Sequence, residues 1–260
     1  MYFYIYDNFL SEKKYERTLA AVETRLTDLG ISGKIGRLSP FTSAKGLIRD
    51  EAKRGSQTVV VVGNDETVSK AIEGIGEVKV TLGMIPIGAP TTIARALGIP
   101  EGVEACEVLS KRVTQKIDLG KVNGKFFLSS LRIPGDRVVI EGEGQYRIST
   151  LAANCEIIVS NLRSGEMLED AQSSLRKSGN PMDGLLDTLI TNRKGGLLGF
   201  ARRENGGSSV IPLRKMMIRS EGPVEAVADG SKFASESFDI EVVPDCLKII
   251  TGRERIFAQI

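Results

Sequence analysis

The first 110 residues alternate between two hydrophobic patterns. Residues 2–6 (YFYIY) and 58–62 (TVVVV) are apolar runs, typical of strands in a parallel sheet that is covered on both faces. Over residues 11–30, apolar side chains instead recur every three or four positions, which predicts a helix with one buried face. Ser11 is a candidate N-cap for this helix, and Gly30 stands just past its end.

Further segments continue the alternation up to about residue 98. We expect helices over 42–55 and 68–75, a strand over 83–88 and a short helix over 91–98. An order in which strands and helices take turns favours an open, mostly parallel sheet with helices on both faces.

After residue 110 the pattern changes to short strands separated by Gly, Asn or Pro. Asn123-Gly124 stands between two strand-like runs, a strong signal for a two-residue hairpin turn. The main helix-like stretch here is 167–179, whose assignment is ambiguous. We therefore predict an α/β domain over 1–110 and a β-sandwich or partly closed barrel over 111–260, with a C-terminal tail that is free to return to the first domain.

Composition narrows the classes of function. The net charge of +2 over 260 residues predicts no nucleic-acid partner, and no apolar run is long enough for a transmembrane segment. The three cysteines are far apart, so we expect buried thiols and a cytoplasmic protein. The chain has no histidine, which excludes His-based acid–base catalysis and Ser-His or Cys-His triads.

Residues 59–75 (VVVVGNDETVSKAIEGI) carry the most informative local pattern. A strand that turns through glycine into a helix is a common phosphate site, because the helix N-terminus offers free N–H groups. Here Glu66 stands in the opening turn, so a carboxylate could occupy the place of the phosphate. Taken alone, GNDET is also compatible with an ordinary turn in which Asn64 or Asp65 caps the helix.

A neighbouring segment resembles a known family. IPIGAPTTIARALGIP (85–100) is similar to the I-P-L-G-T-G-N-D-F-A-R-A-L-G-I-P signature of the diacylglycerol kinase catalytic-domain family, which includes bacterial lipid kinases and sphingosine kinases. GNDET (63–67) falls where that family carries G-G-D-G-T. Further similar segments follow in the family's order, at 116–128, 183–190 and 228–250.

The resemblance implies a fold, a reaction and partners. Members have an NAD-kinase-like α/β domain followed by a β-sandwich, and they transfer the γ-phosphate of ATP to the hydroxyl of a lipid such as diacylglycerol, with Mg²⁺. The implied partners are thus a nucleotide and a lipid, while peripheral membrane contact and a homodimer stay open. The reaction needs phosphates held in line and a carboxylate that accepts the hydroxyl proton.

Matching positions supply the candidate site residues. The resemblance assigns the general base to Asp229, with a turn before Gly230 as the alternative. It assigns a structural magnesium to Asp183 and Asp187, where a plain turn is the alternative. The candidate nucleotide-binding residues are Gly63, Asn64, Asp65, Glu66, Thr67, Gly88 and Arg95, although Arg95 can equally be a solvated surface arginine.

Departures from the family pattern raise a second hypothesis. Asn64 and Glu66 replace glycines of G-G-D-G-T, and Ala89-Pro90-Thr91-Thr92 replaces T-G-N-D. Asparagine tolerates positive φ and can cap a helix, whereas a glutamate about 4 Å from a phosphate would cost about 4 kcal/mol at an effective dielectric of 20. The chain is therefore either a lipid kinase with remodelled loops, using ATP and Mg²⁺, or a pseudokinase that binds or scaffolds without a cofactor.

Overall fold

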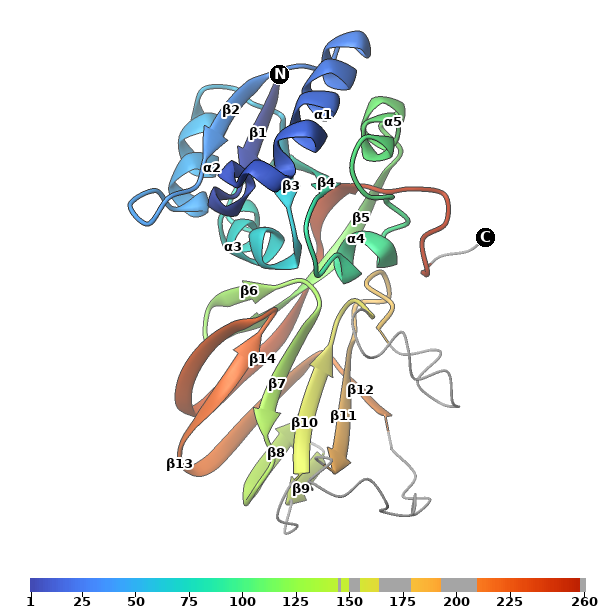
Figure 1. The fold of residues 1–260 in the computed structure, drawn as a ribbon. Helices are drawn as coiled ribbons and strands as arrows, with labels where there is room; N and C mark the ends of the chain where they lie inside the picture. Colours follow the sequence, from blue (N-terminus) through green and yellow to red (C-terminus); the bar gives the residue numbers. More distant parts are fainter. Residues whose placement is uncertain (145, 150–154, 164–178, 193–209, 258–260) are drawn as a thin grey trace, which may run out of the picture. The chain divides into compact units, whose positions relative to one another are not determined.

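The computed structural model describes residues 1–144, 146–149, 155–163, 179–192 and 210–257. The chain forms two compact units (Figure 1). Unit 1 comprises Met1–Leu119 together with Pro244–Ile260, and unit 2 comprises Gly120–Val243. The boundary lies after Leu119, within the strand that begins at Thr114, and not near residue 110; Ile117 and Leu119 of that strand are fully buried in unit 1.

Unit 1 is built on a parallel sheet. The strands are β1 (Tyr2–Tyr6), β2 (Lys34–Arg37), β3 (Thr58–Gly63), β4 (Thr81–Pro86) and the end of β14 (Ser231–Ile250), in the order β14-β4-β3-β1-β2. Every residue of β3 and β4 is buried. The continuous apolar runs of the sequence thus mark strands that are covered on both faces.

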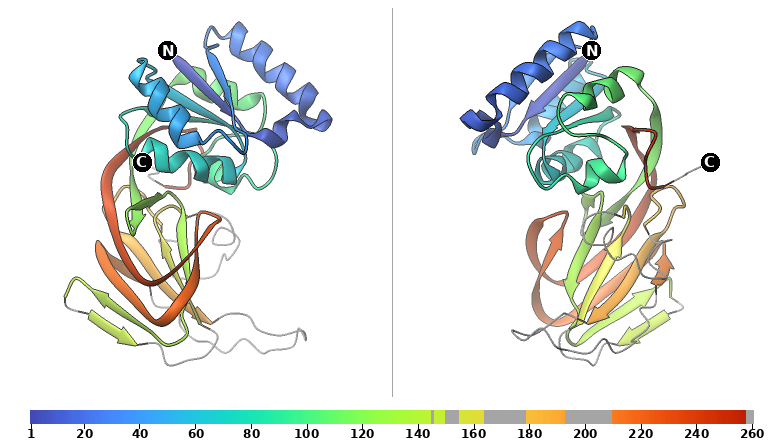
Figure 2. Two further views of the ribbon diagram at one scale, coloured as in Figure 1. Left: turned by 90° about the vertical axis from the view of Figure 1, so that its left-hand side faces the viewer. Right: turned by 45° about the vertical axis from the view of Figure 1, so that its right-hand side comes forward.

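Helices cover both faces of this sheet. They are α1 (Glu16–Asp28), α2 (Ala44–Lys53), α3 (Asp65–Ile75), α4 (Thr92–Ala96) and α5 (Glu104–Lys111). Figure 2 shows α1 and α2 on opposite faces of the sheet. An ion pair between Arg25 and Glu107 joins α1 to α5, and Lys45 of α2 pairs with Glu73 and Glu77 at the end of α3.

The start of α1 differs from the prediction. Ser11 is not its N-cap: Asn8–Ser11 and Lys13–Tyr15 form two short 3-10 turns, and α1 begins at Glu16. Two elements lacked a clear sequence signal. Edge strand β2 buries no residue. Helix α5 buries two small side chains and one leucine. Neither segment therefore shows a strong hydrophobic periodicity.

Unit 2 consists of strands and contains no helix among its described residues. They are β6 (Lys125–Phe127), β7 (Ser130–Pro134), β8 (Val138–Gly142), β9 (Tyr146–Ser149), β10 (Cys155–Ser160), β11 (Leu186–Asn192), β12 (Val210–Leu213) and β13 (Lys215–Ala228). The antiparallel order is β12-β11-β10-β7-β13-β14, and β8 joins β13 to β9. Alternating inward side chains form one core, with Phe127, Phe238 and Ile218 among its members.

The predicted class, an α/β unit and an all-β unit, is confirmed. The hairpin at Asn123-Gly124 is also confirmed, since Val122 of β5 (Thr114–Val122) pairs with Lys125 and both turn residues have positive φ. The ambiguous helical stretch at 167–179 lies, except for its last residue, outside the described part of the chain.

The cysteines are free thiols, as the sequence predicts. Cys106 and Cys155 are buried, whereas Cys246 is half-buried rather than fully enclosed. Burial raises the pKa of the Cys106 thiol to about 11, so this side chain behaves as a small apolar core residue.

Candidate functional site

Three strands of unit 1 end at the same edge of its sheet. The strand order is β14-β4-β3-β1-β2. From β1 the chain adds β2 on one side and then adds β3 and β4 on the other side, so the strand order reverses between β1 and β3. In open α/β sheets, ligands bind at the carboxyl ends of the strands beside such a switch point. Asp7 follows β1, the GNDET turn (63–67) closes β3, and residues 88–92 follow β4. The predicted nucleotide loop therefore lies where this kind of fold places a ligand.

The GNDET turn is a helix start with a reciprocal side-chain cap. The Oδ1 atom of Asn64 accepts a hydrogen bond from the Thr67 amide at 3.2 Å, and the Thr67 hydroxyl accepts one from the Asn64 amide at 3.1 Å. This reciprocal box satisfies both amides. Asn64 has φ −103°, so it serves as an N-cap and does not use positive φ. The capping alternative from the sequence is confirmed for Asn64.

Gly63 is required by the conformation of the same turn. Its φ is +153°, and a Cβ atom there would lie 2.3 Å from the Thr67 hydroxyl oxygen. Any side chain would therefore displace the threonine that completes the cap.

Hydrogen bonds join this turn to the segment after β4. Asn64 Nδ2 donates to Ala89 O at 3.1 Å, and the Asp65 amide donates to Pro90 O at 2.8 Å. In the other direction, the Asp65 carboxylate accepts from the Thr92 amide, the Thr92 hydroxyl and the Ile93 amide at 2.8, 2.6 and 3.1 Å. We call these five hydrogen bonds the loop lock.

The cap and the loop lock together have a direct chemical consequence. A phosphate at a helix N-terminus binds to free backbone N–H groups. Here the amides of Asn64, Asp65 and Thr67 already donate within the protein. Asp65 also caps the start of α4, so its carboxylate is a structural acceptor. Burial raises the pKa of Asp65, and its hydrogen bonds from Thr92 and Ile93, with the nearby Arg95, oppose that rise.

A buried carboxylate that was not among the predicted site residues supports the turn from β1. Asp7 is only 6% exposed and accepts from the Thr67 hydroxyl at 2.9 Å and from Lys70 Nζ at 3.0 Å. The signal was present in the sequence, because Asp7 directly follows the apolar run 2–6 and so stands at a strand end. Lys70 lies one helical turn after Thr67, on the same face of α3.

Glu66 stands at the start of α3, as the sequence indicates. It lies in the first turn of α3, where the helix dipole favours a carboxylate, but its side chain is exposed and has no hydrogen-bond or ion-pair partner among the described residues. The cap is made by Asn64 and Thr67 instead. Glu66 thus lies where its charge favours the helix dipole, as the sequence indicates, while the side-chain cap is made by other residues.

The sequence is similar to those of known proteins. Residues 2–122 match the family model of the diacylglycerol kinase catalytic domain. This part of the chain is therefore similar to the diacylglycerol kinase family. The chain is 27% identical over 129 residues to a diacylglycerol kinase of Bacillus subtilis, a match that covers 48% of this chain and 43% of that relative. It is 25% identical over 244 residues to a probable lipid kinase YegS-like of Pseudomonas aeruginosa, covering 79% and 80%.

A solved structure shows the same fold. A putative diacylglycerol kinase from Bacillus anthracis superposes with a TM-score of 0.79 at 19% sequence identity, over 97% of this chain and 96% of that one. Among the described residues, no helix has the length and apolar character that a membrane span requires.

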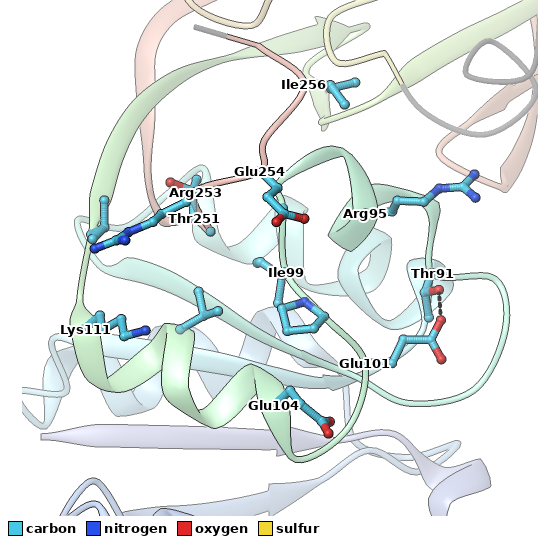
Figure 3. A pocket seen from close by; sticks show the side chains of 15 residues that line it. Thr91, Arg95, Ile99, Glu101, Glu104, Lys111, Thr251, Arg253, Glu254 and Ile256 are labelled. Carbon is cyan, nitrogen blue, oxygen red and sulfur yellow. Dashed lines mark hydrogen bonds between the residues drawn. The ribbon is translucent and has the colours of Figure 1, made fainter. Parts of the chain in front are cut away.

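Gly88 and Arg95, two further positions carried over from the diacylglycerol kinase family, lie in different surroundings. Gly88 has φ +79°, and a Cβ atom there would lie 2.9 Å from the Phe9 ring, so this position requires glycine. Arg95 is exposed on α4 and lines a cavity of about 890 Å³ formed by α4, α5 and the C-terminal segment (Figure 3). None of the GNDET residues lines this cavity.

The candidate base of the diacylglycerol kinase motif, Asp229, lies in unit 2 at the turn between β13 and β14. It has φ +44°, and Gly230 completes the two-residue turn, as in the alternative drawn from the sequence. Its carboxylate accepts hydrogen bonds from the amides of Leu128, Ser129 and Ser130 at 2.6–3.0 Å. The side chain thus fastens the turn to the segment before β7.

Asp183 and Asp187, the predicted metal ligands, also bond to backbone. Asp183 accepts from the Leu185 amide, and Asp187 accepts from the Gly179 amide. Burial raises the pKa of Asp187, against the effect of that hydrogen bond. In the described part of the chain no three acidic or cysteine side chains come together as a metal cage. A magnesium ion would therefore need ligands from substrate phosphates or water, as is usual for this ion.

Proposed function

We propose that this chain is a pseudokinase: a protein that keeps the fold of the lipid kinases but binds or scaffolds instead of transferring phosphate. The observation that carries the proposal is that the cap and the loop lock together use the Asn64, Asp65 and Thr67 amides of the GNDET turn in contacts within the protein. The exposed Glu66 carboxylate beside these amides adds a negative charge where a triphosphate would lie.

The energetic argument concerns competition for the same donors. Phosphoryl transfer depends almost entirely on positioning and on neutralising the phosphates. A nucleotide that used the GNDET amides would first break hydrogen bonds to neutral acceptors, worth about 0.5–1.5 kcal/mol each. Asp7, paired with Lys70, and Asp65, near Arg95, would then face the incoming phosphates.

Nucleotide-dependent stabilisation tests this proposal. The melting temperature and a lipid kinase assay with diacylglycerol are measured with and without ATP and Mg²⁺. The unmodified chain should show no shift in melting temperature and should form no phosphorylated lipid. A nucleotide that did bind, at 100 times its dissociation constant, would raise the free energy of unfolding by about 2.7 kcal/mol. Asn64→Gly combined with Glu66→Gly opens the cap and removes the charge. The melting temperature of this variant should therefore rise when ATP and Mg²⁺ are added.

A matched variant separates the cap from the charge. Asn64→Ser with Glu66→Gln keeps a side-chain acceptor at the cap and removes only the carboxylate. If the occupied amides block the nucleotide, this variant should behave like the unmodified chain. A clear shift with the unmodified chain, together with phosphorylated lipid, would establish the active lipid kinase and end the pseudokinase proposal.

Partners and location belong to the same proposal. By relation to lipid kinases, the bound molecule is expected to be a lipid with a free hydroxyl. Three free cysteines fit a reducing compartment, so we place the protein in the cytoplasm.

A further inference from the structure

The cavity beside α5 lies outside the loop lock and has a mostly apolar lining. Its volume of about 890 Å³ is within the range of sites for small molecules. The apolar part of the lining is made by Ile99, Pro100, Val108, Val113 and Ile256. Val113 and Ile256 are 42% and 41% exposed, although both are large apolar residues. A ligand that covered them would remove apolar surface from water, which favours binding.

The wall of this cavity is fixed by backbone contacts. The C-terminal segment 251–256 follows β14, and the Gly252 amide donates to Leu97 O at 2.9 Å while the Ile256 amide donates to Ala96 O at 3.0 Å. Gly252 lies so close to Gly98 that a Cβ atom on it would be 1.6 Å from Gly98 O. The cavity is therefore formed before any ligand arrives.

Charged side chains of both signs are mixed around this cavity, and their charges balance. The cations are Arg95, Lys111 and Arg253, and the carboxylates are Glu101, Glu104 and Glu254. All six side chains belong to exposed residues, so they form its rim. Figure 3 shows Arg95 on the same side as Glu101, and Glu254 between Arg253 and Arg95. A charged ligand would therefore meet repulsion as well as attraction, and the rim favours a ligand without charge.

A buried hydroxyl lies among the apolar side chains and gives an independent indication of a ligand. Thr251 lines the cavity and is 1% exposed, and its Oγ1 atom has no hydrogen-bond partner among the described residues. Buried polar atoms are nearly always bonded to protein, water or a ligand. Because a hydroxyl both donates and accepts, a single hydroxyl group of a ligand would satisfy this atom.

We infer that this cavity binds a small neutral molecule with an apolar body and one hydroxyl group, of the kind represented by a medium-chain alcohol. The hydroxyl of the ligand bonds to Thr251 Oγ1, and its apolar body covers the side chains of Val113 and Ile256. A neutral ligand also avoids the cost of taking a full charge out of water, which the mixed rim does not offset. Neither the GNDET residues nor Asp229 line the cavity, so the inference does not rest on the proposed function.

Calorimetric titration with three eight-carbon probes tests the preference for a neutral ligand. At pH 7, 1-octanol is neutral, octanoate is an anion and octylammonium is a cation. Octanol should bind tightest, and each charged probe should bind about tenfold more weakly, because a full charge is more costly to bury than a hydroxyl. Equal or tighter binding of a charged probe, or no binding of octanol at millimolar concentration, would overturn the inference.

Variants of Thr251 test the hydroxyl contact. Thr251→Val removes the hydroxyl and keeps the size of the side chain, so octanol should bind about two- to tenfold more weakly, the range of one hydrogen bond. Thr251→Ser keeps the hydroxyl and should bind octanol like the unmodified chain. Without ligand, the melting temperature of Thr251→Val should be no lower than that of the unmodified chain, because Oγ1 loses no protein partner. Unchanged octanol affinity in Thr251→Val, or a lower melting temperature, would contradict the assignment.

A matched pair of exposed apolar residues tests the contact with the apolar body. Val113→Ser removes apolar surface from the cavity and should weaken octanol binding about two- to fivefold. The control is Ile35→Ser on β2, where the side chain is 48% exposed and does not line the cavity, and octanol binding should not change. Equal effects of the two variants would show that octanol does not bind in this cavity.

Discussion

At the residue scale, Asp65 shows how a motif residue can be retained for structure. It occupies the position of the family's aspartate in G-G-D-G-T, and yet both carboxylate oxygens accept hydrogen bonds from the start of α4. The neighbouring Glu66 is a carboxylate without such partners in the described structure. The two residues therefore form a natural pair for comparison.

We predict that Asp65→Asn lowers the free energy of unfolding by about 1–3 kcal/mol, because an amide group cannot accept all three hydrogen bonds. Glu66→Gln, the adjacent control, should change it by less than about 0.5 kcal/mol. Urea unfolding of the two variants measures both values. Equal effects would show that the carboxylate of Asp65 is not a structural acceptor.

The pH dependence of the same variant has a defined sign. Because the pKa of folded Asp65 is raised, the folded protein binds a proton more readily than the unfolded chain does. The stability from this carboxyl group is greatest below its unfolded pKa of about 3.9 and falls as the pH rises through the folded value. The advantage of the unmodified chain over Asp65→Asn should shrink across that window.

Residue-level prediction from the sequence succeeded where the chemistry was local. Glycine at position 63 and a cap at Asn64 follow from a strand that turns into a helix, and both are present. The contact between Asp65 and Thr92 could not be predicted, because it joins turns that are 27 residues apart along the chain. The position of Glu66 in the first turn was predicted, but the reciprocal cap between Asn64 and Thr67 was not.

At the scale of elements, the carboxylate of Asp229 fastens the turn of the β13–β14 hairpin to the segment that leads into β7. Asp229 bonds three consecutive amides at the start of β7 and holds the turn against the neighbouring strand. From the sequence, Asp229 before Gly230 was compatible with either a general base or a turn residue. The geometry explains the aspartate as part of the turn without any need for catalysis.

We predict that Asp229→Ala lowers the free energy of unfolding by about 1–3 kcal/mol, because three partly buried amides lose their acceptor. Asp245→Ala is the matched control, since Asp245 also has positive φ, +51°, but its exposed side chain has no partner that the structure describes. Thermal unfolding of both variants separates the lost acceptor from backbone strain. An Asp229→Ala variant no less stable than the control would contradict this role.

At the scale of the whole molecule, the chain leaves unit 1 after Leu119 and returns to it at Pro244. The returning end of β14 adds a parallel strand beside β4, with Lys248 opposite Thr81 and Ile249 opposite Leu82. The sequence allowed for a returning tail. It could not show that residues 231–250 form one strand, because Pro244 interrupts the apolar pattern.

We predict that Ile249→Ala, which empties a fully buried position, costs about 2–5 kcal/mol and increases amide exchange in β4. The control is Ile35→Ala on edge strand β2, where the side chain is 48% exposed and little should change. Hydrogen exchange measured by mass spectrometry reports both strands. Unchanged protection of β4 would show that the returning strand does not support unit 1.

The discontinuity of unit 1 also sets an order for folding during synthesis. The ribosome makes β1–β4 first, yet the strand that completes their sheet emerges only after all of unit 2. Unit 2 is contiguous along the chain, so it can close while translation continues. The nascent unit 1 meanwhile exposes the open edge of β4, an unpaired template for other chains, which makes this interval the one in which a chaperone would matter most.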